Sequence, residues 1–296
     1  RMKNIVRNSI LITLALAPLT SFSETGCFPE NDLKFSTNNF LKSAQSSQMT
    51  LLKFHQTLDK VYKAWAPIVE RDYSKKLIFI REWENDKVNA HATRDRERNP
   101  VIKVLGGLAR HPEMTVDALA LIVCHELGHY LGGAPKKLRG TSKKRSWSSA
   151  EGQADYFAST KCLPLVFEEQ SLTNHSLNLA KIPELRPLIN YCETELCKRI
   201  ALAGLATTRM FASMKRSQTY PNFKDHSLHV QSSTLYKHAD PQCRLDTIVS
   251  GARCQVSPKE NFDDKDPSIG ACVESNDFFE IKTGARAKCW FNPVRF

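Results

Sequence analysis

A single apolar helix with polar residues inside it constrains this chain more than any other part of its sequence. The segment 115–131 predicts that helix, because residues 118–123 are continuously apolar and Thr115 can cap the first turn. Asp117 favours the positive end of the helix dipole. Glycines and a proline at 132–135 then end the helix. Polar residues inside such a buried helix need a specific chemical reason.

The polar residues form the pattern His125-Glu126-Leu127-Gly128-His129. Because residues four apart share a helix face, both imidazoles can reach one ion. Glu126 projects to the side, where it can accept a proton from water, and this spacing is a signature of zinc hydrolases. Gly128 leaves room for a close approach by another element. We therefore predict His125 and His129 as Zn²⁺ ligands and Glu126 as the catalytic base.

A catalytic zinc needs a third protein ligand and one open position. A histidine six residues after the second ligand would suit a metzincin, but that position is Pro135. Glu151 is the better candidate, because it begins a second helical stretch that carries Asp155 four residues later. Asp155 can then accept the outer N–H of a ligand histidine. The alternative for both acids is an ordinary solvated helix face.

The first residues predict an export signal and a soluble mature chain. Residues 1–23 combine a basic start, a short apolar run and small residues at a cleavage site, as a signal peptide does. No later stretch is apolar enough to cross a membrane, so membrane contact is expected to be peripheral at most. Lipidation of Cys27 is disfavoured, because Glu24 stands where an aliphatic residue is needed. We expect an exported protein, periplasmic or secreted.

The chain has nine cysteines, and an exported protein is expected to pair an even number of them. We predict Cys124 as the unpaired one, because it lies inside the apolar helix beside His125. Cysteines are concentrated after residue 240, so disulfides are expected to stabilise the C-terminal region. The pairing itself is left open by the sequence.

The net charge of +11 favours an acidic partner such as an anionic envelope component. The alternative is that the charge only keeps the protein soluble. Nucleic acid is not expected, since no nucleic-acid-binding signature is present. Six basic residues fall in the predicted loop 136–149, between the second and third predicted ligands. That loop could cover the site as a lid.

Periodicity predicts an α+β fold, a mainly helical core with a small β-sheet followed by a disulfide-rich C-terminal region. Helices are expected at 49–65, 115–131, 150–161 and within 177–214, and strands at 77–80, 88–92 and 101–105. The last two strands should form a hairpin-like pair, and the strand 101–105 could bind an extended substrate. The predicted regions are a signal peptide 1–23, a polar, poorly ordered leader 24–47, a metallopeptidase domain 48–250 and a cysteine-rich extension 251–296.

The helix with His125 and His129, followed by a Glu-x-x-x-Asp helix at 151–155, resembles the gluzincin peptidases of the HtpX and CAAX-prenyl-protease type, including soluble periplasmic members such as BepA. The strand 88–92 and the Gly-Gly-Leu segment at 106–108 also resemble that family. The resemblance covers roughly residues 75–250. It implies a zincin-like fold and Zn²⁺-dependent cleavage of peptide or protein substrates.

A downstream segment, 238–245, resembles the family's His-Pro…Arg segment. This resemblance implies that His238 and Arg244 bind substrate or stabilise the oxyanion. The chain departs from the family at Ala239, where a proline is expected, in lacking membrane helices, and in its cysteine-rich tail.

The sequence thus predicts a zinc-dependent endopeptidase acting in the cell envelope or outside the cell. Two alternatives share its metal residues: a zinc-bearing chaperone-like or gated binding module with weak hydrolytic activity, and a zinc hydrolase of a cell-wall amide. A nucleophile elbow, a phosphate loop and a dinucleotide fingerprint are absent from the sequence.

Overall fold

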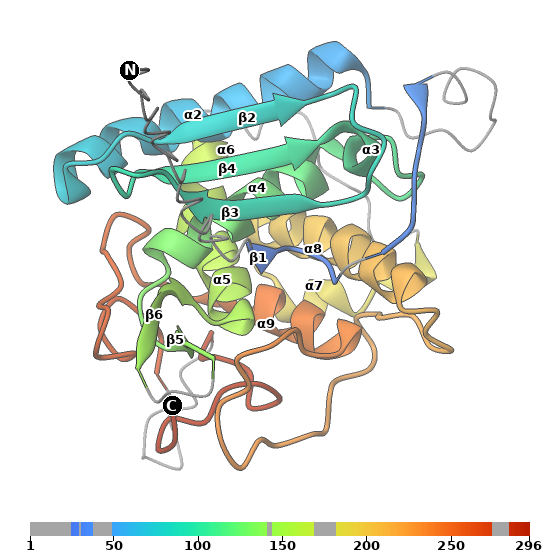
Figure 1. Ribbon diagram of the computed structural model, residues 1–296. Coiled ribbons are helices and arrows are strands. Elements are labelled where there is room, and N and C mark those ends of the chain that lie inside the picture. Colours follow the sequence, from blue (N-terminus) through green and yellow to red (C-terminus); the bar gives the residue numbers. More distant parts are fainter. Residues whose placement is uncertain (1–24, 30, 38–48, 141–143, 169–181, 274–283) are drawn as a thin grey trace, which may run out of the picture.

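The computed structural model describes most of the chain that follows the predicted signal peptide (Figure 1). The described residues are 25–29, 31–37, 49–140, 144–168, 182–273 and 284–296. The predicted signal peptide 1–23 lies outside them, as does much of the predicted leader 24–47.

A mixed four-stranded sheet forms one layer of the molecule, in the order β1-β3-β4-β2. The strands are β1 (Thr25–Gly26), β2 (Ile78–Glu82), β3 (Ala90–Arg94) and β4 (Pro100–Leu105). β3 and β4 pair antiparallel, which confirms the predicted hairpin-like pair. The prediction that 101–105 binds substrate at an edge is wrong, because β2 and β3 flank β4 on both sides.

Two long helices pack beside this sheet. α2 (Leu51–Tyr73) contacts β2 and α4, and α4 (Val116–Leu131) contacts β3 and β4. Thr115 accepts a hydrogen bond from the Ala118 amide at 3.0 Å, which confirms the predicted cap. Nearly all of α4 is buried, so its polar residues face other protein elements rather than solvent.

The remaining helices are α3 (Gly106–Ala109), α5 (Glu151–Phe157), the π-helix η1 (Ala158–Cys162), α6 (Leu163–Glu168), the 3₁₀ helix η4 (Pro183–Leu185), α7 (Leu188–Tyr191), α8 (Glu195–Met214) and α9 (Pro241–Arg253). Among them, α3 follows β4 at the end of the sheet, and α5, α8 and α9 lie below the sheet in Figure 1. α4 packs against α5 and α8, and α9 packs against α5 and α8. Sequence periodicity missed α9, although Asp240 caps it by accepting from the Cys243 amide.

The predicted basic loop 136–149 is a small hairpin. Its strands β5 (Lys136–Leu138) and β6 (Arg145–Ser149) pair antiparallel, and residues 141–143 lie outside the description. Because β6 runs directly into α5, the hairpin lies beside Glu151 at the start of that helix.

Two glycines allow α5 to approach its neighbours. A Cβ on Gly128 would lie 2.9 Å from the Ala154 carbonyl oxygen, so the predicted close approach at Gly128 is confirmed. A Cβ on Gly152 would lie 2.2 Å from the ring of Trp290. α5 is therefore held between α4 and a residue of the C-terminal segment.

The predicted C-terminal extension 251–296 packs directly on the helical core. Arg286 donates to Gln153 at 2.6 Å, and Tyr156 donates to the Gly284 carbonyl at 2.7 Å. The described part of this extension thus packs on α5 and is not a separate appendage.

Eight of the nine cysteines pair, which confirms the expected even number. The disulfides are Cys124–Cys162, Cys192–Cys197, Cys243–Cys289 and Cys254–Cys272. The prediction for Cys124 is wrong, because its side of α4 faces η1, which carries Cys162. The free cysteine is Cys27, which is fully buried. The last two disulfides confirm the stabilised C-terminal region and suggest an oxidising compartment.

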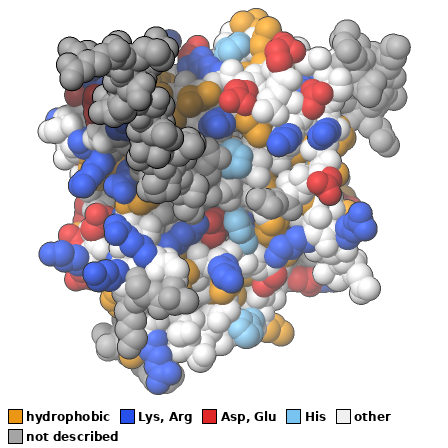
Figure 2. Space-filling view, in the orientation of Figure 1, with side chains coloured by type: hydrophobic (Ala, Val, Ile, Leu, Met, Phe, Trp, Pro, Cys, Tyr) orange, Lys and Arg blue, Asp and Glu red, His pale blue; other side chains and the backbone are white. Residues whose placement is uncertain are grey.

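The fold is α+β, as predicted, with a small sheet and a mainly helical remainder. Within the described residues, none of the helices has the length and apolarity that crossing a membrane requires. Figure 2 shows Lys and Arg side chains spread over one face of the molecule with acidic side chains among them.

We predict that the Cys124–Cys162 disulfide, between α4 and η1, stabilises the fold more than the Cys192–Cys197 disulfide, which closes a much shorter loop. The Cys124–Cys162 pair closes a separation of 38 residues, and the Cys192–Cys197 pair closes 5. By loop-closure entropy, replacing the first pair with alanines should lower the free energy of unfolding by about 4 kcal/mol, against about 2 kcal/mol for the second. Denaturant unfolding under non-reducing conditions measures both. Equal losses would contradict this ranking.

Candidate metal centre

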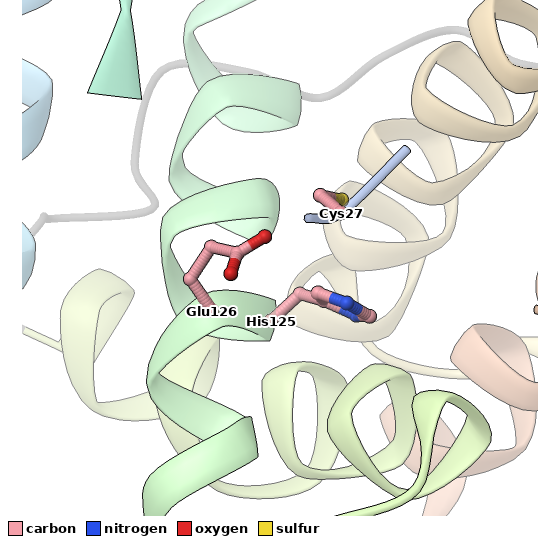
Figure 3. A group of neighbouring side chains, drawn as sticks. All are labelled: Cys27, His125 and Glu126. Carbon is pink, nitrogen blue, oxygen red and sulfur yellow. The ribbon is translucent and has the colours of Figure 1, made fainter. Parts of the chain in front are cut away.

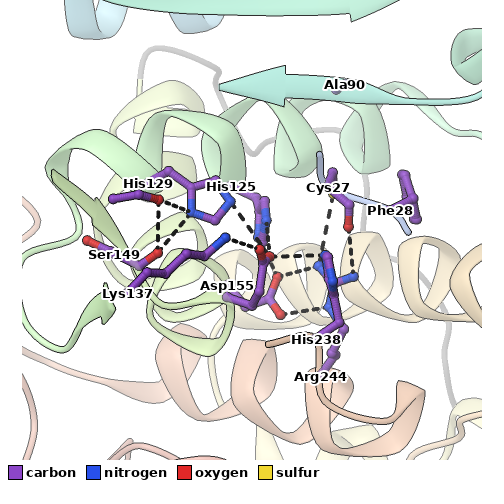
Figure 4. Close-up of polar contacts among 12 residues, drawn as sticks. Cys27, Phe28, Ala90, His125, His129, Lys137, Ser149, Asp155, His238 and Arg244 are labelled. Carbon is purple, nitrogen blue, oxygen red and sulfur yellow. Dashed lines mark hydrogen bonds and ion pairs between the residues drawn. The ribbon is translucent and has the colours of Figure 1, made fainter. Parts of the chain in front are cut away.

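The three predicted ligands meet at one buried point. His125 and His129 come from α4, and Glu151 is the first residue of α5. One ligand atom from each lies within 4.8 Å of the other two, and all three side chains are buried. Figure 4 shows His125 and His129 on the same side of α4, above the helix that carries Asp155. The helical spacing therefore predicted a real cluster.

The atoms that face one another in this cluster are unpaired. His125 Nε2, His129 Nε2 and Glu151 Oε2 are buried and have no hydrogen-bond partner among the described residues. Glu151 Oε2 lies 3.2 Å from His125 Nε2 and 3.6 Å from His129 Nε2. Zinc–ligand bonds in tetrahedral geometry separate the ligand atoms by roughly 3.3–3.6 Å. Because unpaired buried polar atoms are costly, this spacing fits a bound metal ion.

The outer nitrogens of both histidines are held by the protein. His125 Nδ1 lies 2.7 Å from Asp155 Oδ1, and His129 Nδ1 lies 3.0 Å from the Ser149 carbonyl oxygen. Since both partners are acceptors, each Nδ1 carries the hydrogen. In the neutral imidazole, each Nε2 then carries the lone pair that a metal would bind. Asp155 lies where the prediction put it, as an acceptor for the outer N–H of His125.

Charges around the cluster favour an ionised Glu151. Burial opposes ionisation of Glu151, but nearby His129 and Lys137 lower its pKa well below the ordinary value. Lys137 Nζ lies 2.5 Å from Glu151 Oε1, which leaves Oε2 for the metal position. Burial lowers the pKa of His129 well below its ordinary value. Burial also opposes protonation of His125, but Asp155 raises its pKa to about 9.

Glu126 lies next to the cluster and is not part of it. Its side chain is fully buried, and both carboxylate oxygens have no hydrogen-bond partner among the described residues. Burial raises the pKa of Glu126 to about 8. A carboxylate with a raised pKa and free oxygens can take up and release a proton near neutral pH.

Arg244 contacts the site through Asp155. Its Nε and Nη2 donate to the two Asp155 oxygens, each at 2.8 Å, and both side chains are buried. Its Nη1 donates to the Cys27 carbonyl oxygen at 3.3 Å. In this structure two nitrogens of Arg244 hold the carboxylate that orients His125. The role that the family resemblance implied, substrate binding or oxyanion stabilisation, stays a prediction.

His238 lies closer to the metal position than expected. Its Nε2 is 3.1 Å from Glu151 Oε2 and has no hydrogen-bond partner among the described residues. The side chain is 21% exposed, whereas those of His125 and His129 are almost fully buried. His238 thus contacts a predicted ligand, but it is not among the residues whose ligand atoms gather within 4.8 Å of one another.

Sequence reasoning missed two residues at this site. Lys137 belonged to the basic segment, but nothing in the sequence distinguished it from its neighbours. Cys27 lies far away in sequence, yet its Sγ, a ring nitrogen of His125 and a carboxylate oxygen of Glu126 lie within 4.8 Å of one another. Figure 3 shows the thiol facing these two side chains.

A cavity of about 670 Å³ opens beside Glu151 and His238. Residues 137–138 of β5 line one part of it, and Phe28 and Tyr236 line others. A molecule from solvent can therefore approach the cluster from this side.

Comparisons with known proteins identify no relative. No protein-family model matches the chain, and searches of curated proteins and of solved structures found no match. The interpretation of the site consequently depends on its geometry and chemistry.

We predict that Asp155→Ala weakens zinc binding by about 10–100-fold, because His125 loses the acceptor that orients it. Asp117→Ala is a matched control, since Asp117 also receives a two-pronged arginine contact, from Arg199, at 2.7 and 2.8 Å. Competition with a chromogenic chelator measures both affinities. Equal zinc affinity in the two variants would show that Asp155 has no special role.

We predict that His238→Ala leaves zinc affinity within about twofold, because His125, His129 and Glu151 remain as three ligands. The same chelator competition measures this affinity. A loss of about tenfold or more would make His238 a ligand.

Proposed function

We propose that this chain is a zinc-dependent endopeptidase. The observation that carries the proposal is the convergence of three unpaired, buried ligand atoms, from His125, His129 and Glu151, beside the unpaired carboxylate of Glu126. A metal site with a free base next to it is the arrangement that metal-assisted hydrolysis requires.

The donor set supports zinc as the metal. Two imidazole nitrogens and one carboxylate oxygen suit zinc, and they are the ligand types of known zinc peptidase sites. Second contacts from Asp155, Ser149 and Lys137 orient all three ligands. This degree of orientation is typical of a metal site and not of an incidental cluster.

The residues divide the chemistry among them. His125, His129 and Glu151 would hold the zinc, which would supply polarisation of a peptide carbonyl and a more acidic water. Glu126 takes up the water proton on a carboxylate oxygen and delivers it to the leaving amine. His238 is the member best placed to meet the oxyanion, because it is the one partly exposed to the cavity.

The fold supports a zincin of the gluzincin type. α4 carries both histidines and lies against β3, while the next helix supplies the acid and its supporting aspartate. The four disulfides support action outside the reducing cytosol, in the periplasm or in secreted form. Peptide or protein substrates are proposed because β3, beside the site, already binds one extended main chain along its outer edge, that of residues 25–27.

One observation favours the alternative of a gated zinc-binding module. The His238 ring lies 3.1 Å from Glu151 Oε2 and lines the cavity that leads to this ligand, so its position controls access from that side. A gated peptidase and a binding module differ in turnover and not in metal content.

We predict that Glu126→Gln retains zinc and abolishes cleavage of unfolded casein, because Glu126 serves as a base and is not needed as a ligand. Glu151→Ala should instead lose bound zinc, since it removes a ligand. Metal analysis and cleavage assays on the same preparations separate the two effects.

Two outcomes would contradict this assignment. Normal cleavage by zinc-loaded Glu126→Gln would exclude the proposed base. A parent protein that binds zinc, loses it to a chelator and cleaves none of the substrates would favour the binding module.

A further inference from the structure

The N-terminal segment 25–28 lies against the strand edge that faces the candidate site. β1 pairs antiparallel with β3, with Thr25 opposite Ala92 and Gly26 opposite His91. The Cys27 amide continues this ladder by donating to the Ala90 carbonyl at 3.0 Å. β3 pairs with β4 on its other side, so these residues cover the edge that an extended peptide would otherwise use.

The same segment satisfies polar groups that surround the site. The Asn89 side chain accepts from the Phe28 amide and donates to the Phe28 carbonyl, both at 3.2 Å. Arg244 donates to the Cys27 carbonyl at 3.3 Å. Asn89 and Arg244 thus bind main-chain groups of the segment. Because every peptide has such groups, the same side chains could bind a peptide substrate. Figure 4 shows Cys27 and Phe28 between Ala90 and Arg244.

The side chains of the segment fill the space next to the catalytic residues. The Cys27 thiol is fully buried against His125 and Glu126. Phe28 is 2% exposed, and its ring centre lies 6.1 Å from that of Phe211. The prediction of a poorly ordered leader is therefore wrong at these positions, because Cys27 and Phe28 are buried here.

A second attachment holds the segment from its C-terminal side. Arg110 donates to the Phe35 carbonyl at 2.7 Å, and the Phe35 amide donates to Asp86 at 2.9 Å. Residues 25–28 could leave β3 while this attachment stays in place. The tether would give them a high effective concentration at the site.

We propose that residues 25–28 form an autoinhibitory segment, which occupies the path of an extended peptide substrate across β3 and must leave before substrate binds. This inference rests on the proposed peptidase function. The segment would regulate the proposed peptidase site, because a substrate must compete with residues 25–28 for the edge of β3.

The thiol of Cys27 provides a direct test, because the other eight cysteines are in disulfides. In the native zinc-loaded protein, maleimide should label Cys27 slowly. Phe28→Ala should raise the labelling rate about tenfold or more by shifting the segment toward its displaced state. Gly26→Val is a second variant, since a Cβ there meets the Asn89 amide nitrogen at 3.1 Å. Phe35 lies outside the proposed substrate path. In the Phe35→Ala protein, maleimide should therefore label Cys27 more slowly than in the Phe28→Ala or Gly26→Val protein.

A competition experiment tests the link to substrate. In the Glu126→Gln protein, which is expected to bind peptide without cleaving it, an unfolded, cysteine-free polypeptide such as β-casein should accelerate labelling of Cys27. In the active protein, Phe28→Ala should lower KM about tenfold for a fluorogenic peptide and leave kcat nearly unchanged, because closure only reduces the competent fraction. A synthetic peptide of residues 24–32 should inhibit that variant.

The outcomes separate this inference from the proposed function. Slow labelling in both Phe28→Ala and Gly26→Val, or no acceleration by β-casein, overturns the inference whether or not the protein cleaves peptides. Absence of peptidase activity overturns the proposed function, while faster labelling still establishes a displaceable segment. Mass spectrometry that finds cleavage within 25–28 would make the segment a substrate and overturn its inhibitory role.

Discussion

The buried contact of Asp155 with both His125 and Arg244 is the interaction on which the rest of the structure depends. A carboxylate removed from water must be paired, and here an imidazole lies on one side and a guanidinium on the other. Arg244 lowers the pKa of Asp155 and keeps it ionised, although burial acts in the opposite direction. The three residues come from α4, α5 and α9, so one ion-pair network joins the metal helix to two other helices. Through its remaining nitrogen, Arg244 extends this network to the N-terminal segment.

The metal residues could be predicted because their signal is local. His125 and His129 are one helical turn apart, and Glu151 and Asp155 repeat that spacing on the next helix. The pairing of β3 with β4 was also local, since only a short linker separates the strands. In each case, neighbouring residues in sequence determine which side chains share a face. The chemistry of a histidine pair with an intervening glutamate then indicated the function to test.

The rest depends on contacts between distant parts of the chain. Cys124 was predicted to be unpaired because its own helix is apolar, but its partner Cys162 lies on η1, two elements beyond the hairpin. Cys27 reaches the site from another layer of the fold, and its position depends on a two-residue strand too short to give a periodic pattern. The placement of His238 likewise depends on an irregular segment before α9. Periodicity carries no information on such placements, since tertiary packing decides them.

The packing of Trp290 on Gly152 has a consequence for how the site is made. Trp290 comes from a segment far from α5 in sequence, yet it closes the far side of the helix that begins with Glu151. A fragment that carried residues 115–155 alone would contain every predicted ligand but would leave α5 without this cover. The ligand residues by themselves therefore do not define the centre, because its second helix is held in place by a side chain that binds no metal.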